Sequence, residues 1–565
     1  MKLASGIALK GAEIKYIDRS SFGADVAVTF PLLLQEKGSA EYIKTVVPEI
    51  LKTLSSNSII KKAEQKGIYL NILLEDKYIF SSVSSILDPE SKFGTTTKNS
   101  GKTAVVDYSS PNVAKHLHAG HIRSTIIGHV LSNIYAATGF EVHRVNHIND
   151  WGGFGFLLAM YDRYSEKETE YENKNDFLFF LYGQYRAIEE AEKEEWEQLK
   201  VEAGELFRKL ERGEDREKVL WQKMVSWSLL EFQKFYDKLG IVFDAVTGES
   251  AYVKEGAELV NQWLMEGRAV IENGAAIVRF GSDEKDVLVV RRSDESTIYS
   301  TRDLAAIKFR MEAFNPTRIA YEVGQEQGDY FRRLFGTARF LRLVEKETEL
   351  LHVYHGFYVN AESKKKLSSR EGAEGVTRLF DLSEKYFLEK YDRHEDMDLK
   401  SRKEAARLVA LGSIIYHDIK KDRKLPVELS ADISKTIEEF EMSGGAYIIY
   451  TAARARSIVR KFEGEFPKID EVSLDGLSNQ ELNLIKKMNE LPKTVDRAEQ
   501  FSEPSVVAEY LLRLAQDYNS YYESTPILEK DGRVKSPHSL IITAAIARTL
   551  EVGLSICHIK IPDRV

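Results

Sequence analysis

The chain has 565 residues, which is too long for a single hydrophobic core, so several domains are expected. Hydrophobic residues make up 43% and charged residues 30%, and these fractions exclude a disordered chain. The formal net charge of −9 argues against a protein that coats nucleic acid without specificity, although a local basic patch can still bind RNA.

The cellular compartment is predicted from cysteine usage and from the absence of targeting patterns. Cys557 is the single cysteine, which excludes an intrachain disulfide and favours a reducing compartment. The first residues lack the apolar core of a signal peptide, and no uncharged apolar run approaches the roughly 20 residues that span a bilayer. We therefore expect a cytoplasmic protein without a membrane partner.

The first region of the chain combines helical patterns with one β-rich stretch. Residues 40–54 (AEYIKTVVPEILKTL) have helical periodicity, and residues 67–74 (GIYLNILL) are typical of a strand. Residues 88–103 are rich in Gly, Lys, Ser and Thr, which indicates a linker or a long loop. The sequence predicts a small α+β domain over residues 1–102, linker included.

From residue 104 the pattern changes to alternating strands and helices. A strand (103–108), a glycine-containing turn with its helix (118–139) and a second strand (141–150) form a βαβ unit, which requires a parallel sheet. The alternation returns over residues 285–335. These segments predict an α/β domain built on a parallel sheet.

Two further stretches are helical. Residues 186–219 are highly charged and are interpreted as a solvated helix of an insertion. From about residue 400 the chain consists of long amphipathic helices, among them residues 405–419, 446–461 and 504–523. The C-terminal part is therefore predicted to be an all-α domain.

Three histidines, His116, His118 and His121, lie within six residues directly after the first strand of the α/β region. If the helix begins near His118, then His118 and His121 share one face of its first turn. A metal site would need a third or fourth ligand, and the sequence offers one distant cysteine and no second His/Cys cluster. The other alternative is that these histidines have no functional role and simply occupy the start of a helix.

A nucleotide site is the interpretation that uses the whole segment. The N-terminus of a helix after a parallel strand offers free backbone N–H groups and positive dipole charge, both of which bind phosphate. Gly120 lets a flat base or ribose approach the backbone, while Lys115 and Arg123 add positive charge. The imidazoles of His118 and His121 would stabilise charge that develops at phosphorus rather than transfer a proton.

The HAGH tetrapeptide (118–121) resembles the signature of class I aminoacyl-tRNA synthetases, and several ordered segments resemble the arginyl-tRNA synthetase family in particular. These are SSPNVAKHLHAGHIRST (109–125), VNHINDWGGFG (145–155), STIYSTRDLAA (296–306), VGQEQGDYFRRLF (323–335), KKKLSSREG (364–372), GGAYIIYTAARARSI (444–458) and LAQDYNSYYESTPIL (514–528). The likeness runs from about residue 104 to the end, and it is weaker in the N-terminal region.

The resemblance implies a multidomain α/β plus all-α fold. It consists of an α+β N-terminal tRNA-contacting domain with its linker (1–102), a Rossmann-type parallel-sheet catalytic domain (103–380) and a helical anticodon-binding domain (381–565). The catalytic domain would carry an insertion at about 155–290. We expect a monomer.

The resemblance also implies the reaction. ATP and arginine form arginyl-adenylate and pyrophosphate, and the arginyl group then passes to the 3′ end of tRNA(Arg), which is needed for the first step as well. The arginine carboxylate is already ionised and needs no general base, so catalysis is positioning and charge stabilisation. Mg²⁺ would accompany ATP, and no dedicated metal site of the protein is expected.

Residues that match the family's two nucleotide signatures are assigned to ATP. His118, His121, Lys115, Lys366 and Ser368 are the candidate catalytic residues, and Gly120, Lys365 and Arg370 are the candidate ATP-binding residues. The second signature departs from the usual K-M-S-K-S, because Ser369 replaces its second lysine. We expect Lys115 to supply the missing charge.

Recognition of arginine requires a carboxylate, because a guanidinium is planar, always charged and bonded best by two parallel oxygens. The resemblance assigns this role to Asp303, with Tyr299 at its side, Gln327 accepting a further N–H, Asn112 on the α-amino group and Asp107 nearby. Such a polar site rejects analogues by roughly 10⁴ or more, so no editing domain is expected. Tyr330 stands where the family usually has histidine, and stacking on adenine is its expected role.

The C-terminal helices are expected to bind tRNA. Tyr447, Tyr450 and Arg454 lie on one helix and are assigned to anticodon contact, since aromatic rings stack on splayed bases and arginines hold phosphates. From the pattern alone, half-buried tyrosines with solvated arginines are equally probable. Tyr518 and Tyr521, on a second aromatic helix, are expected in the core.

Three alternatives remain open at this point. A lysyl or glutamyl enzyme would share the histidines but lack the set of Tyr299, Asp303 and Gln327. A nucleotidyltransferase would not need the long helical C-terminus. A non-catalytic tRNA-binding paralogue would be expected to have lost a signature histidine, and both are present.

Overall fold

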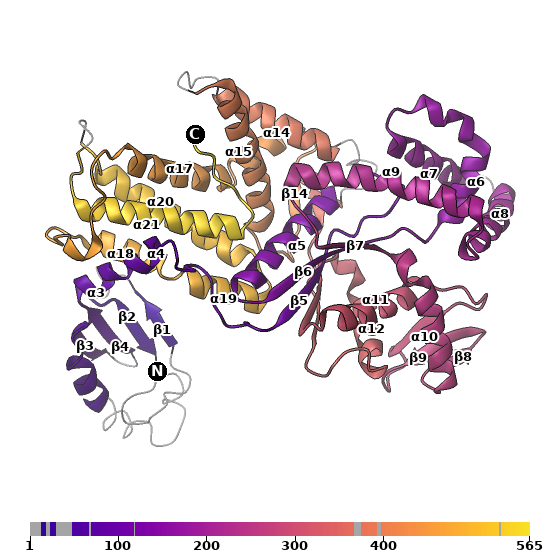
Figure 1. Ribbon diagram of the computed structural model, residues 1–565, viewed down its shortest axis with the longest axis horizontal. Helices are drawn as coiled ribbons and strands as arrows, with labels where there is room; N and C mark the ends of the chain where they lie inside the picture. Colours follow the sequence, from indigo (N-terminus) through magenta and orange to yellow (C-terminus); the bar gives the residue numbers. More distant parts are fainter. Residues whose placement is uncertain are drawn as a thin grey trace.

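The computed structural model describes residues 13–17, 23–29, 48–66, 69–117, 119–191, 193–366, 375–391, 397–529 and 533–564. A parallel sheet lies near the middle of the molecule (Figure 1). The N-terminal sheet and the C-terminal helical bundle lie on one side of it, and the helices between residues 154 and 340 lie on the other.

The N-terminal region is an antiparallel sheet followed by two short helices. Its strands have the order β1-β2-β4-β3. They are β1 (Glu13–Tyr16), β2 (Val26–Thr29), β3 (Ile60–Lys66) and β4 (Tyr69–Leu74), and the helices are α3 (Asp76–Ser81) and α4 (Val83–Leu87). Alternate residues of β4 are buried, as expected for a strand with one face on a core, so the predicted strand at 67–74 is confirmed within the described residues.

The central sheet has five parallel strands in the order β12-β11-β5-β6-β7. They are β5 (Thr103–Asp107), β6 (Glu141–Ile148), β7 (Ala245–Gly248), β11 (Arg318–Tyr321) and β12 (Glu349–His352). The chain leaves β5 towards one edge and later returns on its other side, so the strand order reverses between β5 and β11. Ligands bind outside the carboxyl ends of the strands at such a reversal. The Rossmann-type sheet is therefore confirmed.

Helices cover both faces of this sheet. Ala104 and Val106 of β5 belong to one core and Val105 to the other, because side chains alternate along a strand. One face packs on α5 (Ala119–Ala137); the other packs on α10 (Val253–Met265), α11 (Tyr299–Phe314) and α12 (Gly328–Phe340). The small antiparallel sheet of β8 (Val270–Glu272), β9 (Ala275–Arg279) and β10 (Val287–Arg291) joins the second core.

Between β6 and β7 the chain forms a separate helical unit with its own core. Its elements are α6 (Phe154–Tyr164), the 3₁₀ helix η1 (Ser165–Glu170), α7 (Lys174–Ala191), α8 (Lys193–Glu211) and α9 (Asp215–Leu239). The charged stretch at 186–219 is less solvated than predicted, because α8 buries Leu199, Ala203, Leu206 and Leu210 along one stripe. β7 then returns to the main sheet, so the predicted insertion at about 155–290 contains one strand of that sheet.

The C-terminal part is helical, and its long amphipathic helices are confirmed. The elements are β13 (Tyr358–Asn360), α14 (Gly375–Tyr391), α15 (Leu399–Ile419), β14 (Val427–Leu429), α16 (Ile433–Glu441), α17 (Gly445–Lys461), η4 (Ile469–Glu471), α18 (Asn479–Met488), α19 (Leu491–Phe501), α20 (Ser505–Ser524) and α21 (Pro537–Ile556). α21 alone among the described helices is long and apolar enough to cross a membrane, but 78% of its most apolar stretch is buried in the bundle. The domain limits at residues 102 and 380 stay a prediction.

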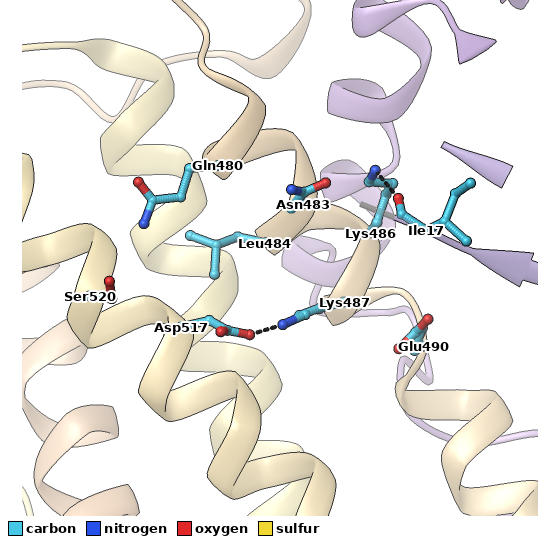
Figure 2. Close-up of a pocket in the computed structure, with 9 residues that line it drawn as sticks. All are labelled: Ile17, Gln480, Asn483, Leu484, Lys486, Lys487, Glu490, Asp517 and Ser520. Atoms are coloured by element: carbon cyan, nitrogen blue, oxygen red, sulfur yellow. Dashed lines mark hydrogen bonds and ion pairs between the residues drawn. The ribbon is translucent and has the colours of Figure 1, made fainter. Parts of the chain in front are cut away.

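A buried ion pair fastens the N-terminal sheet to the helical bundle. Figure 2 shows Lys486 of α18 reaching the backbone carbonyl of Ile17, to which its Nζ donates at 2.7 Å. The same Nζ lies 2.9 Å from Oδ1 of Asp25, and both side chains are at most 4% exposed. A buried pair tolerates the loss of one partner poorly, so this contact fixes how the two regions pack. A cavity of about 380 Å³ beside it is bordered by Gln480 and by the ion pair of Lys487 with Asp517.

Candidate functional site

The loops that follow β5 and β6 meet at the carboxyl ends of these strands. Asn112 and Asn149 form an isolated parallel bridge, and the backbone N–H of Ser110 donates to Oδ1 of Asn146 at 3.1 Å. Asp107 ends β5 and is buried at this position. The sheet reversal thus gathers Asp107 and Asn112, two of the residues assigned to arginine.

The loop after β5 holds a strained backbone. Ser109, Ser110 and Ala114 have φ of 73°, 44° and 62°, a conformation that costs a residue with a side chain on the order of 1 kcal/mol. Hydrogen bonds hold the loop in place: the Ser109 N–H donates to Ser124 Oγ at 3.1 Å, and the Ala114 N–H donates to Ser228 Oγ at 3.0 Å. A loop maintained against such strain is typical of a functional site.

The signature helix α5 begins at Ala119, so the predicted helix start near His118 is confirmed. His118 itself lies outside the described residues, while Gly120 and His121 lie in the first turn. Lys115, on the approach to the helix, has its ammonium 5.3 Å from the ring centroid of Tyr182 in α7. The assignment of these residues to ATP stays a prediction.

Arg123 does not have the role that was predicted for it. It is fully buried, and its guanidinium donates to the carbonyls of Gly356, Asp418, Arg423 and Leu425 and, at 2.6 Å, to the carboxylate of Asp418. These partners lie around β13, the end of α15 and the loop before β14. Arg123 therefore joins the signature helix to the helical part of the chain and cannot add charge at a bound phosphate.

The second signature is described only at its start. Lys365 and Lys366 are exposed, and the ammonium of Lys366 lies 3.7 Å from the ring centroid of Phe357 and 3.7 Å from Glu326 Oε1. Ser368, Ser369 and Arg370 lie outside the described residues. The proposed clamp on the phosphates thus stays a prediction.

The assigned guanidinium ligand, Asp303, lies in the second turn of α11. Its side chain is 25% exposed; Tyr330 donates its hydroxyl to Oδ2, and His147 Nε2 lies 3.8 Å from Oδ1. Burial, reinforced by the charge of Glu249, raises the pKa of Asp303 to about 7. Burial also lowers the pKa of His147 to about 4, so this imidazole is neutral at neutral pH and gives Asp303 no positive partner.

The charges around Asp303 leave it without a cation. Arg302 forms an ion pair with Glu249 at 2.6 Å, and Arg310 forms one with Asp107 at 2.7 Å. Within the described part of the chain, neither a lysine nor an arginine forms an ion pair with Asp303. Its neighbourhood therefore holds one uncompensated carboxylate, which is the charge that a single guanidinium would neutralise.

Arg310 is a functional-site candidate that the sequence reasoning missed. It is 2% exposed, its guanidinium lies 5.2 Å from the ring centroid of Tyr321, and its Nε and Nη1 have no hydrogen-bond partner among the described residues. Orphaned buried donors are rare and mark places where water or a ligand completes the bonding. Its spacing of seven residues from Asp303, two helical turns on one face, was the signal that could have found it.

The other predicted arginine ligands lie around Asp303 at different depths. Tyr299, the first residue of α11, is 54% exposed, and its ring meets that of Tyr330 edge to face with centroids 5.0 Å apart. Gln327 is exposed at the start of α12, three residues before Tyr330. The predicted stacking of Tyr330 on adenine stays a prediction, and the structure adds a contact that was not predicted, from its hydroxyl to Asp303.

Two of the three predicted anticodon residues, Tyr450 and Arg454, border a basic cavity. Tyr447 on α17 is 40% exposed, Tyr450 is half-buried, and Arg454 donates to Asn519 Oδ1 at 2.9 Å. Tyr450 and Arg454 line a cavity of about 680 Å³, whose other lining cations are Lys390, Arg460, Lys461 and Arg564. Tyr518 and Tyr521 are buried, so their predicted core position is confirmed.

Comparison with known proteins agrees with this geometry. A family model described as "tRNA synthetases class I (R), catalytic domain" matches residues 82–428, and one described as "DALR anticodon binding domain" matches residues 448–565. The arginine–tRNA ligase of Chloroflexus aggregans is 32% identical over 533 residues, which cover 94% of this chain and 90% of that protein. That of Exiguobacterium sp. is 30% identical over 556 residues, which cover 97% and 95%.

Solved structures show the same fold. The Thermus thermophilus arginyl-tRNA synthetase matches with a TM-score of 0.78 at 21% identity, over 98% of this chain and 96% of that one. The Plasmodium falciparum arginyl-tRNA synthetase matches with a TM-score of 0.77 at 21% identity, over 100% and 96%. The sheet, the signature helix and the catalytic-domain match define a class I aminoacyl-tRNA synthetase. Within that class, the chain belongs to the arginyl-tRNA synthetase family.

Proposed function

We propose that the chain is an arginine–tRNA ligase, which activates arginine with ATP and transfers it to the 3′ end of tRNA(Arg). The observation that supports this most directly is the half-buried carboxylate of Asp303, which lacks a cation at the reversal of the parallel sheet. Glu249, Asp107 and Arg310, whose charges act on Asp303, are each paired with another side chain. A cationic amino acid side chain supplies the missing partner.

The guanidinium of arginine fits this site better than the compact ammonium of lysine does. A guanidinium bonds a carboxylate through two parallel N–H groups and stacks on aromatic rings, and Tyr299 offers a ring beside Asp303. Gln327 accepts a further N–H of the substrate, and Asn112 holds the α-amino group near the end of β5. Asp107 adds a second carboxylate near the substrate, and its ion pair with Arg310 holds it in place.

The activation step uses the loops at the start of α5. The arginine carboxylate attacks the α-phosphorus of ATP and pyrophosphate leaves, so the protein has to align the two substrates and stabilise the developing charge. His118, His121 and the backbone at Gly120 serve the α-phosphate and ribose, and Lys115 adds positive charge. Lys365, Lys366, Ser368 and Arg370 form the clamp on the β- and γ-phosphates.

Mg²⁺ is proposed to arrive with ATP as part of the substrate. No group of three or more His, Cys, Asp or Glu side chains that could hold a metal ion occurs among the described residues. Mg²⁺ keeps several waters and usually binds through substrate phosphates rather than in a protein cage. The ion would spread the negative charge of the triphosphate while the clamp holds its oxygens.

Binding of tRNA is assigned to the cavity along α17. Arginines and lysines that line a cavity beside half-buried tyrosines suit an unpaired RNA loop, whose bases stack on rings while cations hold phosphates. Tyr447, Tyr450 and Arg454 are the contacts we propose. We also propose that the enzyme acts as a monomer in the cytoplasm, where the one cysteine, Cys557, stays reduced in the core.

The test of this function is pyrophosphate exchange with ATP, measured with each amino acid, with and without total tRNA. We expect exchange with arginine alone, and only when tRNA is present. Exchange with another amino acid would keep the class of enzyme and overturn the role of Asp303. No exchange from protein shown to be folded would favour a non-catalytic tRNA binder.

A further inference from the structure

Tyr330 contacts the carboxylate that is proposed to bind the substrate guanidinium. It is the third residue of α12, and its hydroxyl donates to Oδ2 of Asp303 on the neighbouring helix α11. The ring is wedged edge to face between Tyr299, at a centroid distance of 5.0 Å, and Phe331, at 5.4 Å. These contacts leave the phenol little freedom, so the hydroxyl stays on the carboxylate.

We propose that Tyr330 is a positioning residue for arginine: it fixes the orientation of Asp303 and keeps this carboxylate ionised for the incoming guanidinium. The inference rests on the proposed function, because it concerns the same amino acid site. Tyr330 touches Asp303 rather than the substrate, and its effect on arginine passes through that carboxylate.

The orientation part follows from the geometry of a carboxylate. Asp303 has two oxygens, and a bidentate guanidinium needs both of them turned towards it. The Tyr330 hydroxyl occupies one lone pair of Oδ2 and stops rotation of the group. Oδ1 faces His147 at 3.8 Å, which is too long for a hydrogen bond and leaves that oxygen available.

The ionisation part follows from the surroundings of Asp303. Burial and the charges of Glu249 and Asp107 raise its pKa, whereas the Tyr330 hydrogen bond and the charge of Arg310 lower it, and the balance is a value of about 7. The groups that face Asp303 come from every element around it, namely Asp107 on β5, His147 on β6, Glu249 in the 3₁₀ helix η2 (Glu249–Tyr252), Arg310 on α11, Tyr321 on β11 and Tyr330 on α12. Among them, Tyr330 is the one that donates a hydrogen bond to the carboxylate.

Removal of the hydroxyl alone should therefore weaken arginine binding in a pH-dependent way. Arginine is a cation at every pH of interest and binds the ionised form of Asp303, so bound arginine displaces the proton of any protonated Asp303. With a pKa of about 7 the wild type releases about half a proton per arginine at pH 7. In Tyr330→Phe we expect the midpoint to rise by about one pH unit, since a hydrogen bond to a charged group is worth at least that much.

The experiment is isothermal titration calorimetry of the full chain with arginine between pH 5.5 and 9, in two buffers that differ in ionisation enthalpy. For Tyr330→Phe we expect proton release at pH 7 to approach about one per arginine and affinity at pH 7 to fall about fivefold or more. At pH 9 Asp303 is ionised in both proteins, so any loss of arginine affinity that persists there measures the loss of carboxylate orientation. In Asp303→Asn proton release should vanish, and adding Tyr330→Phe to it should then change nothing further.

Tyr161→Phe is the matched control, because its hydroxyl also donates to a carboxylate, Glu168 Oε2 at 2.7 Å, within the helical unit of α6–α9. It should leave arginine affinity and proton release unchanged, which shows that loss of a tyrosine hydroxyl does not act through general loosening. Circular dichroism and Tm of each variant report folding. If Tyr330→Phe does not fold, Tyr330→His gives the same readout, because its smaller ring fits the same space and its nitrogens do not extend as far as the tyrosine hydroxyl.

Each result decides one of the two proposals. If the wild type binds arginine with proton release and Tyr330→Phe behaves identically, the role of Tyr330 is overturned and the proposed function stands. If Tyr330→Phe weakens ATP binding and leaves arginine binding unaffected, the hydroxyl serves ATP rather than arginine, and the role of Tyr330 proposed here is overturned. If the wild type binds another amino acid and no arginine, the proposed function and this inference fall together.

Discussion

Two buried arginines on the helices that flank the central sheet have opposite environments. Arg123, in the second turn of α5, uses its guanidinium nitrogens in five hydrogen bonds to the carbonyl and carboxylate groups of four residues. Arg310, towards the end of α11, bonds Asp107 and leaves Nε and Nη1 without a hydrogen-bond partner among the described residues.

The difference separates a structural charge from a functional one. A buried charge with every donor satisfied is locked in place, and Arg123 accordingly ties the signature helix to the chain around Asp418 and Gly356. A buried charge with orphaned donors is stable only where water or a ligand can reach it. The neighbourhood of Arg310 and Asp303 is therefore built to be completed by a substrate, and the neighbourhood of Arg123 is complete.

The largest effect on activity is expected for Asp303→Asn. The change keeps the shape of the side chain and removes the charge that the substrate guanidinium needs, which typically costs about 2–5 kcal/mol in a buried charged pair. We expect kcat/KM for arginine to fall by about 10²–10³-fold, with little change in KM for ATP. Steady-state pyrophosphate exchange measures both constants, and an unchanged arginine KM would show that the guanidinium binds elsewhere.

The largest effect on stability is expected for Arg123→Met. The variant leaves the carboxylate of Asp418 and several carbonyls buried without their donor, and loss of one partner of a buried pair costs about 3–5 kcal/mol. The loss should appear as a lower urea midpoint at unchanged m. Arg310→Met is the comparison: it removes one hydrogen bond rather than five, so we expect a smaller loss of stability and a larger loss of arginine affinity. Equal losses of stability would erase the distinction between the two sites.

The activity of the wild type should depend on pH through Asp303. Its pKa is raised to about 7, so the carboxylate is progressively protonated, and loses its attraction for arginine, as pH falls below that value. We expect kcat/KM for arginine to fall about tenfold per pH unit below about pH 6.5 and to level off above about pH 8. Asp303→Asn, measured over the same range, should lack this limb. If kcat/KM of the variant still falls at low pH, the titration belongs to a group other than Asp303.

The smallest effect is expected at the basic cavity of α17. Arg454→Ala removes one of several cations and a hydrogen bond to Asn519, which stays largely buried beside Thr451. We expect KM for tRNA to rise about fivefold to tenfold, with a shallower dependence on salt, and KM for arginine to be unchanged. Arg163→Ala, which breaks surface ion pairs on α6, is the matched control. An equal effect of both variants on tRNA would argue against the cavity.

Sequence periodicity was enough to predict most of the fold. The βαβ unit, the helix start near His118 and the long helices α15, α17 and α20 follow from local patterns that the structure keeps. The four-residue strand β7 was missed, because an edge strand that short has no periodicity of its own. The buried face of α8 was not predicted, because the charged residues of this helix outnumber the residues that it buries.

The site was predictable only where residues near in sequence act together. Tyr299 and Asp303 share one helix, and their proximity follows from spacing. Arg123 was misjudged because its partners lie more than 230 residues away, and an arginine in the second turn of a helix ordinarily points to solvent. The contact of Tyr330 with Asp303 was missed for the same reason, because Asp303 lies on another helix.

A crystal structure of the full chain with bound arginine tests most directly whether Asp303 is the carboxylate kept unpaired for arginine. We predict that the guanidinium bonds Asp303 through two N–H groups at about 2.8 Å, with the Tyr330 hydroxyl still on Oδ2 and Arg310 still on Asp107. A guanidinium seated on Asp107 with Arg310 displaced, or one that leaves Asp303 without a cation, would contradict the account.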